Sequence, residues 1–272
     1  MAIISFWNQN NSSTGRTTAL LSMATYLTIQ HKYKILVIDT SFNSYSIKDS
    51  FWVEKKQSFF KQNKSQIELG TGINSLSRAI LSNKISPETI TNYTKIVFNR
   101  FEVLTDTKIS REEYDRNKKI FKQIAKTADK YYDIVLIDVD KNLDEDIVED
   151  LLELSKIIVV PMKQNLRELS TFLNLKEKYK EKYTLMPLLS MYDSESKFSY
   201  KKVTKYFKEK QEVLIIPYNT KLMEVSSEGK LADFFIENRK MNDKNINSIL
   251  IQQVKMFSEA IISKLKELQT RI

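Results

Sequence analysis

The sequence predicts an α/β fold, with a single doubly wound, mostly parallel sheet flanked by helices in one domain spanning residues 1–272. Short apolar runs typical of buried parallel strands alternate with segments of helical spacing. Two of these runs, Lys34–Asp39 and Tyr132–Asp138, end in the same Ile-Asp pair. In addition, 42% of the 272 residues are hydrophobic, which is enough to bury a large sheet, and no Pro/Gly-rich linker divides the chain.

The first forty residues give the most informative order of elements. An apolar strand at Ala2–Trp7 is followed by a polar loop at Asn8–Thr18, a helix at Ala19–Gln30 and the strand at Lys34–Asp39. This order begins a phosphate-binding βαβ unit, in which loop N–H groups and a helix N-terminus surround the phosphates. The loop ends in GRTT at residues 15–18, where Gly-Lys-Thr-Thr is usual. Taken alone, GRTT is explained more often by an ordinary capped strand-to-helix turn.

The rest of the chain continues the alternation. Residues 44–70 are polar and aromatic without a clear period, so helical or irregular structure is expected there. A helix is expected to open at Ser86-Pro87-Glu88, because proline is favourable in a first turn. We expect further helices at Gly72–Leu81, Arg111–Lys130, Asn165–Lys180 and Asn245–Leu268, and strands at Lys95–Phe98, Phe101–Leu104, Ile157–Pro161, Tyr183–Ser190 and Val213–Asn219.

Acidic side chains terminate two of the predicted strands. Asp39 and Asp138 would lie at the carboxyl edge of a parallel sheet, where ligands of such sheets bind. The alternative for each acid is a carboxylate that caps the turn after its strand. Two such strands beside one GRTT loop favour the functional interpretation.

These motifs, in this order, resemble the ParA/MinD family of P-loop ATPases, the deviant Walker A branch of the SIMIBI class, over residues 2–268. The family loop reads K-G-G-x-G-K-[ST]-T, so Asn11, Ser12 and Ser13 stand at Lys-Gly-Gly and Arg16 replaces the invariant lysine. The resemblance implies a P-loop fold that binds ATP and Mg²⁺. It implies catalytic roles for Asn11, Arg16 and Asp39, nucleotide contacts from Ser12, Ser13, Thr14, Gly15, Arg16, Thr17, Thr18, Pro217 and Asn219, and metal contacts from Thr17, Asp39 and Asp138.

The departures from the family pattern bear on its mechanism. Asn11 lacks the charge that reaches the partner's phosphates in family dimers, and Ser41 replaces the second acid of the family's D-x-D. Arg16 keeps a charge, but its planar fork is no point-charge substitute for an ammonium group. Loss of one such electrostatic group costs roughly a hundredfold or more in rate. We therefore expect hydrolysis to be slow or lost. Base recognition is open, because Ser190-Met191-Tyr192-Asp193 replaces the family's Asn-Arg-Tyr-Asp.

Composition excludes several classes of protein. The chain has no cysteine, which excludes a disulfide framework, a thiolate metal site and a cysteine nucleophile. His31, the single histidine, ends the first helix, where a solvated cap is the simplest interpretation. We expect neither a signal peptide nor a membrane span, and therefore a cytoplasmic protein.

The net charge of +9 favours acidic partners. The stretch from Lys176 to Lys210 contains ten lysines against five acids, with interleaved aromatic residues. Two interpretations explain this basic stretch about equally. One is a solvated helix face, and the other is sequence-independent DNA binding through Lys197, Lys201, Lys202 and Lys205. The resemblance favours DNA.

Three functions follow from the resemblance. The first is an ATP-dependent, homodimeric switch that partitions or positions DNA or a cell-envelope assembly and binds a cargo or adaptor protein. The second is a nucleotide-independent pseudo-ATPase scaffold of the pilus-locating, TadZ-like type. The third, a ligase on the same fold, lacks a substrate motif.

The amphipathic segment at Asn245–Leu268 could bind a membrane, as the last helix of MinD does, but packing on the sheet is the commoner role of such a stripe.

Overall fold

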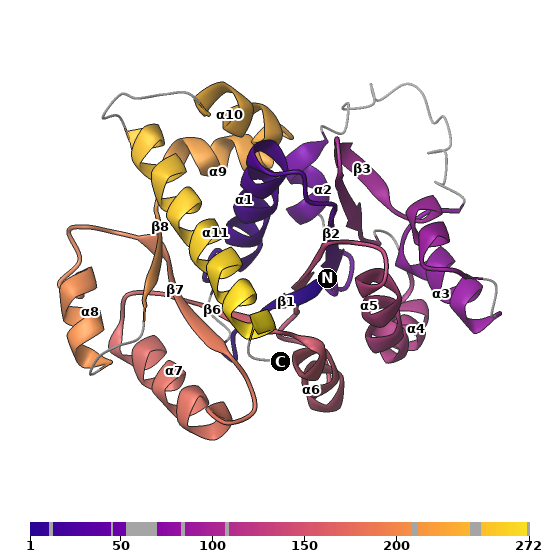
Figure 1. Cartoon of the computed structure of the whole chain (residues 1–272), viewed down its shortest axis with the longest axis horizontal. Helices are drawn as coiled ribbons and strands as arrows, with labels where there is room; N and C mark the ends of the chain where they lie inside the picture. The colour runs from indigo at the N-terminus through magenta and orange to yellow at the C-terminus, as the bar shows by residue number, and fades with distance from the viewer. Residues whose placement is uncertain are drawn as a thin grey trace.

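Eight strands form one sheet in the computed structural model, which describes residues 1–10, 13–44, 46–52, 70–82, 85–106, 109–207, 212–239 and 246–270 (Figure 1). The strand order is β3-β4-β2-β5-β1-β6-β7-β8, and every neighbouring pair is parallel except the edge pair β3–β4. This confirms the predicted fold class. The strands are β1 (Ala2–Phe6), β2 (Ile35–Asp39), β3 (Lys95–Phe98), β4 (Phe101–Leu104), β5 (Ile134–Asp138), β6 (Ile157–Met162), β7 (Leu185–Tyr192) and β8 (Leu214–Pro217).

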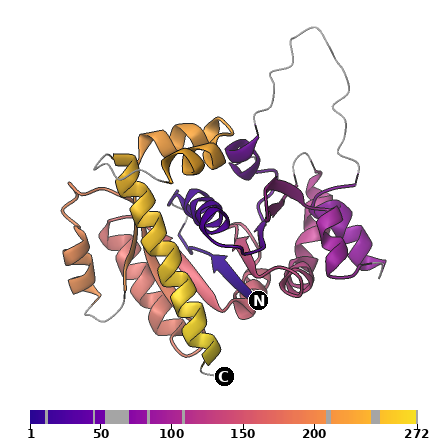
Figure 2. The same cartoon turned by 45° about the horizontal axis from the view of Figure 1, so that its top comes forward.

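Helices cover both faces of the sheet. The first face carries α1 (Arg16–Gln30), α2 (Ser46–Phe51), α9 (Thr220–Ser227), α10 (Leu231–Asn238) and α11 (Ile246–Thr270). Figure 2 shows α11 lying across the sheet on this side. The second face carries α3 (Ile73–Leu81), α4 (Arg111–Asn117), α5 (Phe121–Asp129), α6 (Glu145–Leu154), α7 (Leu166–Tyr179) and α8 (Tyr200–Tyr206).

Alternation along the strands separates the two cores. In β1, Ile4 and Phe6 pack under α1, whereas Ile3 belongs to the opposite core. The central strands are buried on both faces, which is why they are almost continuously apolar in sequence. β1 and β5 are neighbours at the centre of the sheet. The crossover after β1 leads to β2 on one side of this pair, and the crossover after β5 leads to β6 on the other side. The carboxyl ends of β1 and β5 therefore form a topological switch point, where open α/β sheets bind their ligands.

Two predicted helices differ from the structure. The expected continuous helix at Arg111–Lys130 is interrupted by a 3₁₀ turn at Lys118–Ile120 between α4 and α5. The interruption allows Tyr114 and Phe121 to pack in the same core, while the Tyr114 hydroxyl donates to the Thr40 carbonyl at 2.8 Å. The helix expected to open at Ser86-Pro87-Glu88 is a 3₁₀ turn at Glu88–Asn92, close before β3.

The apolar stripe of α11 faces the protein. Leu250, Val254, Phe257, Ile261 and Leu265 are buried in the core beneath α11, and α11 lies against β8 and α1. Asn245, the expected first residue of this helix, lies outside the described residues. Across the described part of the chain, each helix is too short or too polar to cross a lipid bilayer.

Candidate functional site

The loop after β1 leads into the N-terminus of α1. Gly15 is the N-cap residue and has left-handed backbone angles of φ 67° and ψ 23°, which favour glycine. No described side chain caps this helix, and its first turn contains no acidic residue. The first intrahelical bond runs from Ala19 N–H to the Gly15 carbonyl at 2.9 Å. The N–H groups before it are therefore open to an anionic ligand.

The remainder of the predicted loop is only partly described. Asn11 and Ser12 lie outside the described residues, so their predicted roles stay predictions. Ser13 is exposed and Thr14 is buried. The Ser190 hydroxyl, at the end of β7, donates a short hydrogen bond to the Thr14 carbonyl. This bond fixes the loop against β7, a contact that nothing in the sequence indicated.

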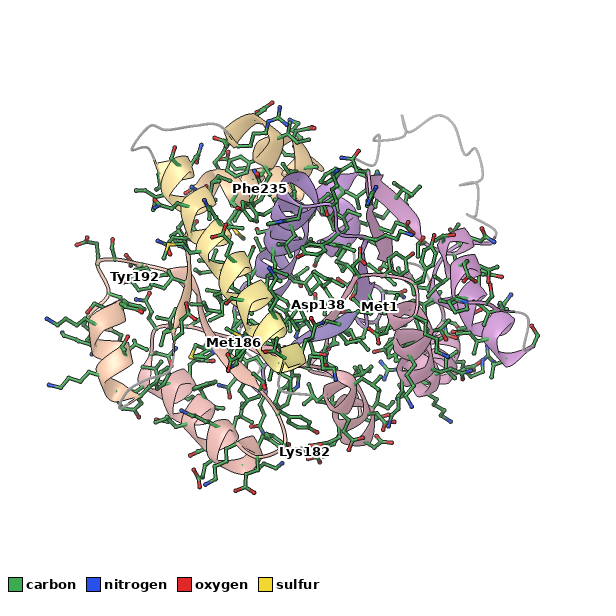
Figure 3. All side chains as sticks on the ribbon, in the orientation of Figure 1. Met1, Asp138, Lys182, Met186, Tyr192 and Phe235 are labelled. Carbon is green, nitrogen blue, oxygen red and sulfur yellow. The ribbon has the colours of Figure 1, made fainter. Side chains whose placement is uncertain are left out.

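Asp138, at the end of β5, is bonded to the first turn of α1. Arg16 Nε donates to Asp138 Oδ1 in an ion pair, and Thr17 Oγ1 donates to Asp138 Oδ2 at 2.5 Å. The Asp138 side chain is 2% exposed and that of Arg16 is 16% exposed. Figure 3 shows Asp138 near the centre of the molecule. Asp138, Arg16 and Thr17, which the sequence analysis assigned to one site, therefore lie together. The direct ion pair between Arg16 and Asp138 was not expected.

Asp39 ends the neighbouring strand, β2, directly opposite Asp138 in the register. Its carboxylate accepts hydrogen bonds from Ser41 N–H at 2.9 Å and from Thr105 Oγ1 at 3.3 Å. Burial and the charge of Asp138 raise the pKa of Asp39 to about 7. Thr105 follows β4 at the same sheet edge, and no sequence motif pointed to it.

The raised pKa of Asp39 predicts a pH-dependent stability. The pKa is about 3.9 in the unfolded chain and about 7 in the folded one, so Asp39 favours folding less as the pH rises between these values. In that window the contribution of Asp39 lowers the free energy of unfolding by about 1.4 kcal/mol for each unit by which the pH rises. Asp39→Asn removes it, so the variant is expected to be the more stable protein above neutral pH.

Urea unfolding of the Asp39→Asn variant and the wild type across this pH range measures the difference. The difference should shrink as the pH falls toward 4, because the wild-type carboxyl becomes protonated. Comparing the two proteins cancels the contribution of Asp106, whose pKa is also raised by burial, to about 6. A stability difference that does not change with pH would contradict the prediction.

A small hollow lies beside Gly15, among residues for which the resemblance implied nucleotide contacts. Thr18, Ser190, Met191, Pro217 and Asn219 contribute to its wall, and its volume is about 20 Å³. That volume holds about one water molecule. Met191 lies at a bulge between β7 and β8 with a left-handed φ of 56°. Its Cγ would be 3.1 Å from a Cβ built on Gly15, so Met191 occupies the space above the loop glycine.

Asn219 is engaged within the protein. Its Oδ1 accepts the Leu222 N–H at 2.8 Å as the N-cap of α9, and its Nδ2 donates to Asn247 of α11 at 3.1 Å. The residue is 2% exposed. The structure therefore brings Thr18, Pro217 and Asn219 together, as the resemblance implied, but a base could enter only after Met191 moves.

The predicted magnesium ligands lie together, but the carboxylate of Asp138 is already engaged. Mg²⁺ is held octahedrally by oxygen atoms, many of them water molecules bonded to carboxylates. At Asp138, Arg16 bonds one of the two oxygens and brings a positive charge to the place expected for the ion. The described residues include no group of three His, Cys, Asp or Glu side chains suited to a metal. As arranged here, with both oxygens of Asp138 bonded to the first turn of α1, Thr17, Asp39 and Asp138 do not fit a divalent cation, although no observation tests the predicted metal contacts directly.

The basic residues form a separate surface at α8. Lys197, Lys201, Lys202 and Lys205 are exposed, and among the described residues none of them pairs with a carboxylate. Lys180 and Lys182, in the same basic stretch, instead pair with Glu177 and with Glu149 and Glu153. A hollow of about 370 Å³ lies beside α8 and is lined by Leu169, Lys197, Phe198, Lys202 and Tyr206.

The amino-terminal part of the chain matches a known family. A family model described as AAA domain matches residues 1–191 of the 272. Comparison with curated proteins gives no sequence match.

Several solved structures share the fold. A ParA family ATPase from Chlorobium tepidum superposes with a TM-score of 0.68 at 13% identity, covering 94% of this chain and 97% of that one. The septum site-determining protein MinD from Pyrococcus horikoshii, in complex with Mg-ADP, gives 0.67 at 14% identity, with 96% and 95% covered. The MinC:MinD cell division protein complex of Aquifex aeolicus gives 0.60 at 14% identity, with 97% and 96% covered.

Proposed function

Since the chain belongs to the AAA domain family and has the fold of the ParA and MinD ATPases, we propose that it binds ATP and acts as a dimerising switch with slow or no hydrolysis. Its cargo would be DNA or an assembly of the cell envelope. The observation that carries the proposal is the uncapped N-terminus of α1 behind Gly15, directly opposite the two acid-tipped strands.

The chain's own groups support binding of a triphosphate. The open N–H groups of the first turn of α1 and the positive end of its dipole suit phosphate oxygens. A side chain at position 15 would be strained at φ 67° and would meet Met191, so glycine keeps the backbone accessible. The hollow beside Pro217 is where a base would enter, with Met191 displaced. The site would thus bind the phosphates first and adapt to the base.

The same geometry supports slow hydrolysis. Ser41 uses its backbone N–H to bond Asp39, and its side chain offers a hydroxyl where the resembled family has a carboxylate. Asp39 is buried, and its raised pKa leaves it partly protonated near neutral pH. No other acid of the described residues ends a strand beside the loop, so the orientation of an attacking water is poorly supported.

Equilibrium binding of a fluorescent ATP analogue, together with a phosphate-release assay, tests this proposal. We expect binding with little release of phosphate. Gly15→Val should abolish binding, because the branched side chain is strained at a left-handed φ and blocks the backbone N–H groups. Gly229→Val, at a left-handed glycine with φ 72° outside the site, is the matched control for backbone strain and should leave binding intact. Rapid turnover would contradict slow hydrolysis, and absence of binding would contradict the nucleotide site.

We also propose a homodimer, an adaptor or cargo protein as a partner, and sequence-independent DNA contact through the lysines around α8. The MinD of Aquifex aeolicus was solved in complex with MinC, which supports a partner protein for a chain of this fold. Light scattering with and without the ATP analogue tests dimerisation. A dimer that forms equally well without nucleotide would favour the pseudo-ATPase scaffold over the switch.

A further inference from the structure

The ion pair at the end of β5 joins a loop cation to a buried acid. Arg16 Nε bonds Asp138 Oδ1, and the Thr17 hydroxyl bonds Oδ2, so both carboxylate oxygens are bonded to the first turn of α1. The Asp138 side chain is almost fully buried, which makes its negative charge costly without a compensating cation. Arg16 supplies that cation from within the chain.

A divalent ion at the same place would meet unfavourable conditions. It would have to displace the guanidinium from Asp138 or lie within a few ångströms of it, and like charges so close repel strongly in a buried site. A guanidinium group carries its charge permanently in proteins, so it offers no neutral form that would admit the ion. The described residues provide no third metal-binding side chain that would offset the repulsion.

Arg16 can contact an anion while it stays on Asp138. The guanidinium has five N–H donors in a planar fork, and its Nε–H is the one used by Asp138. Its two terminal nitrogens make no hydrogen bond to any described residue, and the side chain is 16% exposed. Guanidinium groups bind phosphate oxygens in pairs. A lysine has a single nitrogen, so it cannot serve both partners across the same span.

We propose that the Arg16 guanidinium takes the place of the divalent cation beside Asp138, so that this site binds the nucleoside triphosphate without requiring Mg²⁺. The inference rests on the proposed function, because it concerns the same nucleotide. It assigns to one residue both the neutralisation of the buried acid and the contact with the phosphates. Arg16 is therefore the determinant of metal dependence.

Equilibrium binding of a fluorescent, non-hydrolysable ATP analogue in excess Mg²⁺ and in EDTA tests the proposal on the unmodified protein. The two dissociation constants are expected to agree within about twofold, because the protein supplies the compensating charge itself. If binding is at least about tenfold weaker in EDTA, the inference is overturned and the proposed function stays intact. A tenfold change corresponds to the loss of about one charge-assisted hydrogen bond. No binding under either condition would overturn the proposed function as well.

Arg16→Lys gives the converse result. The ammonium group can leave Asp138 for the phosphates and open one carboxylate oxygen to the water shell of an ion. Binding by this variant is expected to become at least about tenfold tighter with Mg²⁺ than with EDTA. Arg78→Lys, at a side chain that is 71% exposed, is the control and should leave both affinities unchanged. If Arg16→Lys binds equally well with and without Mg²⁺ while its thermal unfolding shows it folded, Arg16 does not determine metal dependence.

Discussion

Replacing Phe257 with alanine is expected to lower the free energy of unfolding by about 3–5 kcal/mol. Phe257 is 1% exposed and lies on the inward face of α11. Its ring meets that of Phe6 of β1 edge-on, with the centroids 6.1 Å apart. The substitution therefore removes a large side chain from the core beside the central strand and leaves a cavity that the sheet cannot close. Urea or thermal unfolding measures the loss.

Met256→Ala is the matched control for this prediction. Met256 is the preceding residue of α11 but is 55% exposed, so its replacement should change stability by no more than about 0.5 kcal/mol. The pair of variants also separates core packing from the membrane-binding alternative for this helix. If Phe257→Ala unfolds like the wild type and instead loses binding to anionic vesicles, the helix does not depend on its packing.

Replacing Lys197, Lys201, Lys202 and Lys205 together with glutamine is expected to weaken binding to arbitrary duplex DNA on the order of a thousandfold at moderate salt. All four lysines, three on α8 and Lys197 in the segment before it, are exposed without a carboxylate partner in the described part of the chain, so each is available to a phosphate. Four lost phosphate contacts should also lower the salt dependence, the slope of log K against log salt, by about 4. Fluorescence anisotropy over a salt series gives both values.

Four other lysines form the control for charge alone. Lys122, Lys180, Lys182 and Lys230 are each paired with a carboxylate, and replacing them with glutamine lowers the net charge by the same amount. This variant should keep most of the wild-type affinity and salt dependence. Equal losses in the two variants would show that only the overall charge of the protein matters. A wild-type protein that does not bind duplex at low salt would remove the DNA contact from the proposed function.

The sequence by itself determined the fold and the edge of the sheet where the candidate site lies. The strands at Lys95–Phe98 and Phe101–Leu104 agree with the structure residue for residue, and the predicted runs ending in Asp39 and Asp138 are neighbouring strands. Such predictions succeed because burial of a strand or a helix face imposes a local period on the chain, and because parallel strands end at one edge.

Only the tertiary structure decided which contacts the residues of the candidate site make. The sequence shows that Arg16 carries a charge at the end of the loop, but its contact with Asp138 depends on the approach of α1 to β5, across 122 positions of sequence. Met191 fills the space above Gly15 because a bulge between β7 and β8 turns it there, and Asn219 is drawn into the cap of α9 and a bond to α11. The register of distant strands and the packing of helices fix these contacts, and neither can be predicted from a local pattern of residues.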